Sequence, residues 1–189
     1  SDNFFYEEAL KYFQSCEYKK AIDFFNSIID SEEFNEWTKK EQGELFNNRA
    51  MSFYYLGKYA SAYKDLTKVI SLFSSKRKNL ILYWKRAMSS YYQKKYVNAI
   101  SDLDHVIKLN QDPYFYFYRS SSKKLLGDST SIYKRSSLTD VKVDISSAKN
   151  LYEDALRDIE FAIKNFKNDT VTKEEMTISE FEDLRSSVL

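Results

Sequence analysis

A pair of small residues recurs four times along this chain, and the two members lie twelve residues apart in three of the four copies. The fourth copy carries an insertion between its two small residues. The pairs are Ala9 with Ala21, Ala50 with Ala62, Ala87 with Ala99, and Ser121 with Ala155. Two helices that pack closely need a small residue where their backbones approach each other. The repeat therefore predicts a stack of helix pairs, in which neighbouring pairs bury each other's apolar faces.

Residues around the second alanines support this prediction. A tyrosine stands three residues before each of them, namely Tyr18, Tyr59, Tyr96 and Tyr152. The 189 residues include only 3 Gly and 1 Pro, the residues on which tight turns depend most. The composition therefore favours helices joined by short polar turns.

The sequence lacks the residues that several kinds of catalytic, metal-binding and phosphate-binding site require. Cys16 is the only cysteine and His105 the only histidine, which argues against an internal disulfide, a multi-thiolate zinc site and a histidine-based catalytic triad. The 3 glycines lie far apart in the sequence, so they form no phosphate-binding loop. We therefore expect no catalytic residues, no metal and no cofactor, and the sequence predicts a non-enzymatic protein.

Charge and hydropathy limit the kinds of partner that we expect. The formal net charge of +1 argues against a nucleic-acid partner. No apolar run approaches the roughly 20 residues that cross a bilayer, so no membrane insertion is expected. A single cysteine is compatible with a reducing compartment, and we expect a cytoplasmic protein.

The second and third copies carry the most specific pattern, in the segments Asn48–Tyr59 with Ala62 and Arg86–Leu103. In these segments the chain resembles the tetratricopeptide repeat (TPR) family, and the resemblance extends over about residues 3 to 167. It implies an all-α fold, a right-handed superhelix of about four TPR helix pairs followed by a C-terminal capping helix.

The resemblance places a single TPR array over residues 1–189. The repeats are expected at about 3–33, 43–75, 80–113 and 114–167, and the capping helix at about 172–187. A capping box of Thr172 with Glu175 is predicted to begin that last helix. The insertion at about 128–147 is predicted to be a loop with helical extensions on both sides.

Particular residues predict how the helices end and begin. Gly57 and Gly127 each follow a leucine, and each is predicted to end a helix in the left-handed conformation. Asp112 is predicted to cap a helix that begins at the proline after it. In the linker before the second repeat, Phe34 and Trp37 are expected to fold back onto the array.

In the TPR family the first helices line the concave face, and residues three or four apart share one side of a helix. These positions are rich in aromatic residues and Met, which are enriched where protein surfaces bind partners. Lys85 and Arg119 align at one repeat position and supply positive charge. The predicted peptide-binding groove consists of Tyr6, Asn47, Asn48, Met51, Tyr54, Trp84, Lys85, Met88, Tyr91, Tyr118 and Arg119.

Two interpretations of this surface stay open. In the first, the groove binds an extended or helical peptide, with the rings as anchors and the two cations holding acidic groups. In the second, the rings pack within the chain, and the cations form salt bridges with neighbouring helices.

Co-chaperone TPR domains hold the acidic tail of heat-shock chaperones with a clamp of Lys, Arg and Asn side chains. Asn48 and Lys85 match that clamp, whereas Tyr6, Leu10 and Ile81 stand at its other positions. Because two lysines are replaced by apolar groups, a conventional clamp is not expected.

The sequence thus predicts a protein- or peptide-binding adaptor or scaffold whose partner it does not name. One alternative is a structural or self-associating module, whose apolar surface is covered by another copy in a homodimer or by neighbouring domains. Others are a co-chaperone-like domain with an atypical carboxylate clamp and a chaperone that shields apolar segments of secretion substrates.

Overall fold

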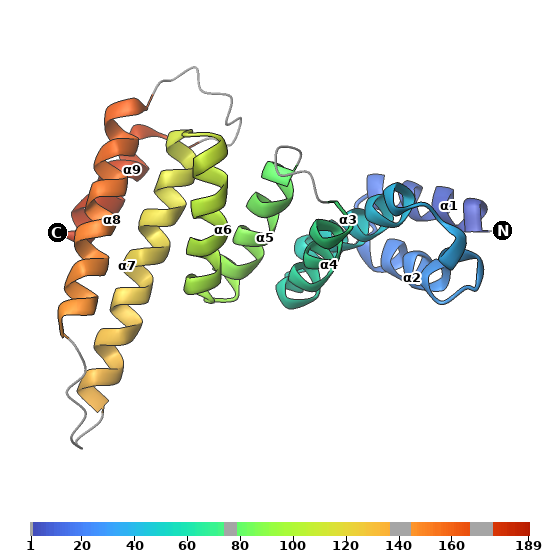
Figure 1. Cartoon of the computed structure of the whole chain (residues 1–189), viewed down its shortest axis with the longest axis horizontal. Helices are drawn as coiled ribbons and strands as arrows, with labels where there is room; N and C mark the ends of the chain where they lie inside the picture. Colours follow the sequence, from blue (N-terminus) through green and yellow to red (C-terminus); the bar gives the residue numbers. More distant parts are fainter. Residues whose placement is uncertain (1, 74–78, 137–144, 167–175) are drawn as a thin grey trace. The chain divides into compact units, whose positions relative to one another are not determined.

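The structure, a computed structural model, describes residues 2–73, 79–136, 145–166 and 176–189 (Figure 1). It divides into two compact units, Ser1–Lys94 and Lys95–Leu189. Every regular element within the described ranges is helical, which confirms the predicted all-α class. A superhelix would describe how the two units are arranged relative to each other. The predicted right-handed superhelix therefore stays a prediction.

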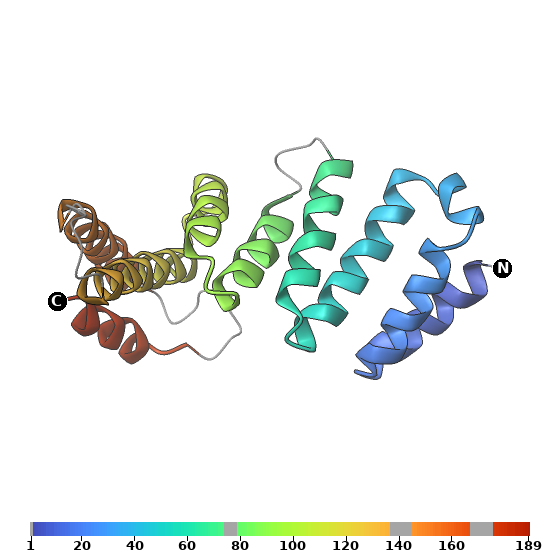
Figure 2. The same cartoon turned by 90° about the horizontal axis from the view of Figure 1, so that it is seen from below.

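The first unit consists of two helix pairs and a further helix. Its elements are α1 (Asp2–Gln14), α2 (Tyr18–Ile29), the short 3-10 helix η1 (Glu33–Glu36), α3 (Lys39–Tyr55), α4 (Tyr59–Leu72) and α5 (Leu80–Tyr92). Each helix packs on the next in sequence, and α3 also touches α1. The antiparallel pairing of α3 with α4 is plain in Figure 2.

The second unit is built around one long helix pair. Its elements are α6 (Tyr96–Leu109), α7 (Pro113–Ser136), α8 (Ile145–Asn165) and α9 (Ile178–Val188). Helix α9 packs mainly on α8 and touches α7 at fewer places, as α3 does with α2 and α1. Within the described ranges, no helix is both long and apolar enough to cross a membrane.

The small residues of the repeat lie where the helices meet. Ala9, Ala21, Ala50 and Ala62 of the first unit are each 0% exposed. Leu66 and Val69 extend the buried face of α4 beyond them. The predicted role of the small residues in close packing is confirmed in this unit.

The turns between paired helices share one backbone conformation. Cys16, Gly57 and Lys94 have φ values of 59°, 71° and 60°, and each stands two residues before the tyrosine that begins the next helix. The predicted left-handed Gly57 is confirmed. Cys16 and Lys94 take the same conformation without being glycine, and the sequence pattern did not reveal this equivalence.

Two other local predictions are confirmed. The amide nitrogen of Tyr114 donates to the Asp112 carboxylate at 2.9 Å, and α7 begins at the proline between them. Phe34 and Trp37 fold back as expected, with the Phe34 ring centroid 5.8 Å from that of Phe46. Trp37 meets the ring of Tyr6 edge-on at 5.6 Å.

The fourth repeat is shifted by one residue from its predicted alignment. Ser120, not Ser121, occupies the position of Ala50, because its hydroxyl is fully buried and donates to the carbonyl oxygen of Ala155 at 2.7 Å. Arg119, which precedes it, lies over the ring of the residue three positions earlier, 5.2 Å from the ring centroid. Arg49 and Arg86 also lie over the rings of the residues three positions before them. Arg119 therefore corresponds to these arginines and not to Lys85.

Gly127 does not end a helix, contrary to the prediction. Helix α7 continues through it to Ser136, and α8 begins at Ile145. A Cβ atom at Gly127 would stand 2.9 Å from the ring of Tyr152, whose hydroxyl donates to Asp128 at 2.8 Å. Here the glycine lets two helices approach closely. The predicted helical extensions are thus present, while residues 137–144 of the insertion lie outside the described ranges.

The last helix begins later than predicted. Met176 and Thr177 are not helical, and α9 begins at Ile178. The capping box that begins it joins Thr177 with Glu180, whereas Thr172 and Glu175 lie outside the described residues. Phe181 of α9 is buried against Phe166 and Phe117, so the helix covers one end of the α7–α8 pair.

Gly57 gives a direct test of the turn. Gly57→Ala should lower the free energy of unfolding by about 1 to 2 kcal/mol, because a side chain in the left-handed region strains the backbone. No described atom lies within 4 Å of the added Cβ, so backbone strain is the source of the loss. Gly57→Asn should lose less, since Asn tolerates this conformation. Urea unfolding followed by circular dichroism checks both, and equal stability of the three proteins would contradict the assignment.

Candidate functional site

Polar side chains of the predicted groove form hydrogen bonds between α1, α3 and α5 of the first unit. The amide nitrogen Nδ2 of Asn48 on α3 donates to the hydroxyl of Tyr6 on α1 at 3.3 Å. The ammonium group of Lys85 on α5 donates to Oδ1 of Asn47 on α3 at 3.1 Å. We call these four residues the polar line. Its two hydrogen bonds link α1 to α3 and α3 to α5.

Lys85 is the member of the polar line with unbalanced charge. Burial lowers the pKa of its ammonium group below the ordinary value for lysine. Among the described residues, no carboxylate forms an ion pair with it, and its hydrogen bond goes to a neutral amide. Desolvation of an uncompensated cation is costly, so a carboxylate arriving here would be stabilised.

Tyr6 belongs both to the polar line and to the apolar core. Its ring lies between Trp37 and Phe25, at centroid distances of 5.6 and 6.2 Å. Burial raises the pKa of its hydroxyl, the hydrogen bond from Asn48 lowers it, and the nearby charge of Glu44 raises it again. Tyr6 is therefore a fixed, neutral hydrogen-bonding group at one end of the line.

The apolar members of the predicted groove differ in exposure. Met88 is only 5% exposed, so it serves the packing of α5. Met51, Tyr54, Trp84 and Tyr91 are half-buried and leave part of each side chain on the surface. Packing within the chain therefore accounts for the Met88 side chain and, in part, for the rings of Tyr6 and Tyr54, the latter of which meets the rings of Tyr55 and Tyr59.

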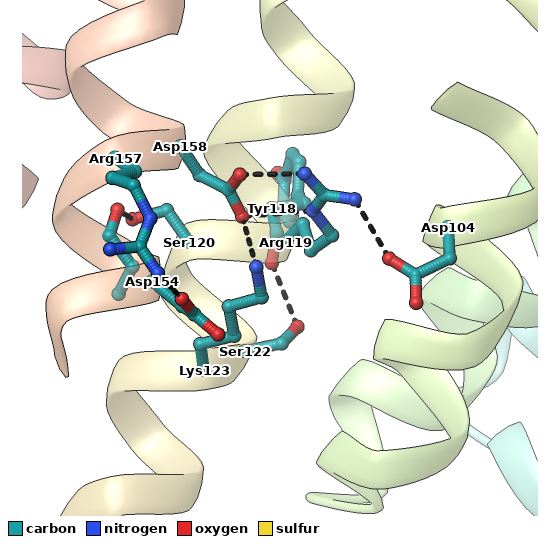
Figure 3. A network of polar contacts seen from close by, with 10 residues as sticks. Asp104, Tyr118, Arg119, Ser120, Ser122, Lys123, Asp154, Arg157 and Asp158 are labelled. Atoms are coloured by element: carbon teal, nitrogen blue, oxygen red, sulfur yellow. Dashed lines mark hydrogen bonds and ion pairs between the residues drawn. The ribbon is translucent and has the colours of Figure 1, made fainter. Parts of the chain in front are cut away.

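Arg119 and Tyr118 belong to the second unit, and Arg119 is held by other residues of that unit. Figure 3 shows its guanidinium between α8 and α6. It donates to both carboxylate oxygens of Asp158 at 2.8 and 2.6 Å and to Asp104 at 2.8 Å. Burial lowers the pKa of Arg119, but hydrogen bonds and charge from the two aspartates raise it above the ordinary value. This is the salt bridge that the second interpretation expects.

The first unit contains the same bridge around Arg49. Its guanidinium donates to both oxygens of Asp65 at 2.8 Å and to Oδ1 of Asn26 at 2.8 Å. Arg49 on α3 thus links α4 to α2. In the same way, Arg119 on α7 links α8 to α6. The second interpretation of the sequence expects a salt bridge from Arg119 to a neighbouring helix, but the partners of neither bridge were predicted. A signal for them was present: an aspartate stands three residues after three of the second alanines, at Asp65, Asp102 and Asp158.

The site offers binding groups and little reactive chemistry. Within the part of the chain that the structure describes, no group of three or more His, Cys, Asp or Glu side chains could hold a metal. Cys16 is exposed in a turn. The polar line thus presents amide, hydroxyl and ammonium groups, all of which form hydrogen bonds.

Comparison with known proteins identifies the architecture. The chain matches a solved structure described as the MamA RS-1 ArsTM double mutant, with 13% identity, 99% of this chain and 92% of that chain covered, and a TM-score of 0.54. That protein is a TPR domain. The chain has a TPR-like helical-repeat fold.

Two further solved structures resemble this TPR-like chain. The first TPR of Spaghetti (RPAP3), bound to HSP90 peptide SRMEEVD, is 23% identical over 68% of this chain and 92% of its own, with a TM-score of 0.49. A putative protein binding protein from Bacteroides ovatus ATCC 8483 is 12% identical over 100% of both chains, with a TM-score of 0.45. No family model and no curated protein sequence matches the chain.

The arginine bridge of the second unit predicts a large effect of one substitution. Asp158 is 7% exposed, and its carboxylate also accepts from Lys123. Asp158→Ala would leave half-buried Lys123 without this carboxylate and Arg119 with Asp104 alone, so we expect a loss of about 3 kcal/mol in the free energy of unfolding.

A neighbouring aspartate on the same helix provides the control. Asp154 pairs with Arg157 on the surface (Figure 3), and Asp154→Ala should change stability by less than about 1 kcal/mol. Chemical unfolding of the two variants measures the difference. Similar losses for both would show that the Arg119 bridge does not hold the unit together.

Proposed function

We propose that the face of α1, α3 and α5 binds a segment of another protein, and that the Lys85 ammonium group pairs with a carboxylate of that segment. One observation carries the proposal: Lys85 is half-buried, has a lowered pKa and pairs with no carboxylate among the described residues. A partner that brings a carboxylate would restore the favourable Coulomb interaction lost on burial, with a charge-assisted hydrogen bond of about 1.5 to 3 kcal/mol.

The amides of the polar line favour a peptide over other ligands. An asparagine side chain both donates and accepts hydrogen bonds, as does each residue of a peptide backbone. Asn47 and Asn48 are neighbours on α3 and bind Lys85 and Tyr6 in the free protein. A bound main chain can take over these contacts without leaving a buried group unpaired.

Half-buried rings next to the line supply the apolar part of the surface. Trp84 adjoins Lys85 on α5, while Met51 and Tyr54 follow Asn47 at helical spacing on α3. Trp and Tyr dominate the energetics of many protein interfaces. The chain would then act as a non-enzymatic adaptor or scaffold, with Lys85 for charge and Trp84 for apolar contact.

The proposed surface needs only one carboxylate on the partner. A conventional clamp would hold two, and Tyr6, Leu10 and Ile81 offer no cation for the second. Arg119 is not part of the proposed surface, because Asp158 and Asp104 hold it. Tyr118 lies beside it in the second unit and is left out as well.

A displayed library of random peptides tests the proposal. Peptides selected on the chain should carry an acidic residue beside an apolar one. Lys85→Met should weaken them at least tenfold, and Trp84→Ala should cost more than about 2 kcal/mol. Lys64→Met, which removes an exposed lysine of α4, is the matched control and should change little.

Two outcomes would contradict the proposed surface. Selected peptides could bind all three variants with equal affinity while circular dichroism shows an intact fold. Alternatively, analytical ultracentrifugation could show a dimer that Lys85→Met and Trp84→Ala dissociate, which would assign this face to self-association.

The lowered pKa of Lys85 predicts how affinity depends on pH. Because a carboxylate binds the charged form, affinity should be constant at neutral pH and fall as pH rises through the pKa of Lys85 in the free protein. That fall should begin at a lower pH than an ordinary lysine would give. Lys85→Arg keeps its charge at these pH values, so its affinity should stay flat. Calorimetric titrations between neutral and alkaline pH measure both, and identical profiles would exclude Lys85 as the carboxylate-binding group.

A further inference from the structure

A row of tyrosine rings runs along the turns of the first unit. None of them belongs to the polar line, and one, Tyr54, also belongs to the apolar part of the surface proposed above. Two parallel stacks repeat in it: Tyr18 on Tyr55, with centroids 4.9 Å apart, and Tyr59 on Tyr92, with centroids 5.0 Å apart. Tyr54 joins the stacks, since its ring meets those of Tyr55 and Tyr59 edge-on at 6.0 and 5.2 Å. We call these five residues the tyrosine row.

The two stacks are equivalent parts of successive repeats. In each, the tyrosine that begins a second helix stacks on a tyrosine at the end of the following first helix. The row therefore presents ring faces at the spacing of the repeat. An extended chain lying along the turns would meet one stack after another.

The outer rings of the row are open to solvent. Tyr55 is 56% exposed and Tyr92 is 44% exposed. Rings already ordered by stacking lose little conformational freedom when a partner covers them. Tyrosine is also a residue that interfaces favour, because its apolar body carries a polar tip.

Positive charge accompanies the row. Exposed Lys58 follows Tyr55 by three residues, and exposed Lys94 follows Tyr92 by two. Lys19, next to Tyr18, is exposed as well. The acidic residue of these turns, Glu17, is paired with Lys20. The first turns of α2 and α4 contain no acidic residue.

We propose that the tyrosine row and its lysines form a second docking surface, which binds an acidic, aromatic-containing segment of a partner protein in extended conformation. Carboxylates of the segment would pair with Lys58 and Lys94, and its rings would pack on Tyr55 and Tyr92. Charge complementarity selects an acidic partner. An acidic protein is favoured over single-stranded nucleic acid because the whole chain carries a net charge of only +1, whereas strand binders use a strongly basic groove.

Synthetic copolymers of defined composition test this surface. A fluorescent random copolymer of glutamate and tyrosine should bind the full chain saturably. It should bind at least tenfold more tightly than polyglutamate of equal length, and a lysine–tyrosine copolymer should not bind. Fluorescence anisotropy at moderate salt measures all three.

Substitutions in the tyrosine row and its lysines test whether the copolymer binds there. Lys58→Glu with Lys94→Glu should weaken the glutamate–tyrosine copolymer at least tenfold. The control Lys39→Glu with Lys64→Glu changes net charge equally at exposed sites of α3 and α4 and should weaken it less than twofold. Tyr55→Ser with Tyr92→Ser should reduce binding to the level of polyglutamate, with the fold checked by circular dichroism.

Other results would overturn the proposal. Equal weakening by both charge-reversal pairs would show nonspecific attraction, and binding of an oligothymidine in place of the copolymer would assign the row to nucleic acid. The copolymer measurements are repeated in a Lys85→Met background, which removes the carboxylate-binding group of the face of α1, α3 and α5. In that background Lys58→Glu with Lys94→Glu should still weaken the copolymer at least tenfold, so failure of the row is distinguished from failure of that face.

Discussion

A guanidinium group shared by three helices fixes the position of one helix in each unit, α3 in the first and α7 in the second. Arg49 spans Asp65 and Asn26, and Arg119 spans Asp158 and Asp104. The planar group presents its donors in fixed directions, so it reaches both partners only when the three helices stand at one spacing and rotation. Apolar side chains tolerate small shifts more readily. The buried alanines allow the helices to pack closely, and the bridge adds a constraint on the angle between them.

That constraint determines what the opposite side of the helix presents. Residues two apart on an α-helix point in nearly opposite directions, so Asn47 and Met51 face away from the partners of Arg49. Asn47 there meets Lys85, and its neighbour Asn48 meets Tyr6. Charge is neutralised on the side of the bridge and left unneutralised at Lys85. The difference between the two sides is the physical basis for treating the Lys85 side as a binding face.

Much of the fold was predictable because backbone packing leaves a local pattern. Paired small residues and the tyrosine that begins a second helix are visible in the sequence, and the helices around Ala50 and Ala62 follow from them. The fourth repeat was harder. Three serines stand in succession at 120–122, so residue size does not distinguish Ser120 from Ser121. The contacts of the folded chain do, namely the hydrogen bond from Ser120 to Ala155 and the position of Arg119. Gly127 follows a leucine as Gly57 does, but the distant ring of Tyr152 makes it an interior helix residue.

The candidate site was predictable in part, for the same reason. Helical spacing alone places Asn47, Trp84 and Lys85 on first helices, whereas the partners of Arg119 depend on α6 and α8. The proposed binding face depends above all on Lys85 being a half-buried cation that a partner's carboxylate neutralises. An NMR titration of the Lys85 side chain, in the free protein and with a bound acidic peptide, tests this most directly. We predict a midpoint below that of ordinary lysine in the free protein and a rise when the peptide binds. An ordinary midpoint that the peptide does not move would contradict it.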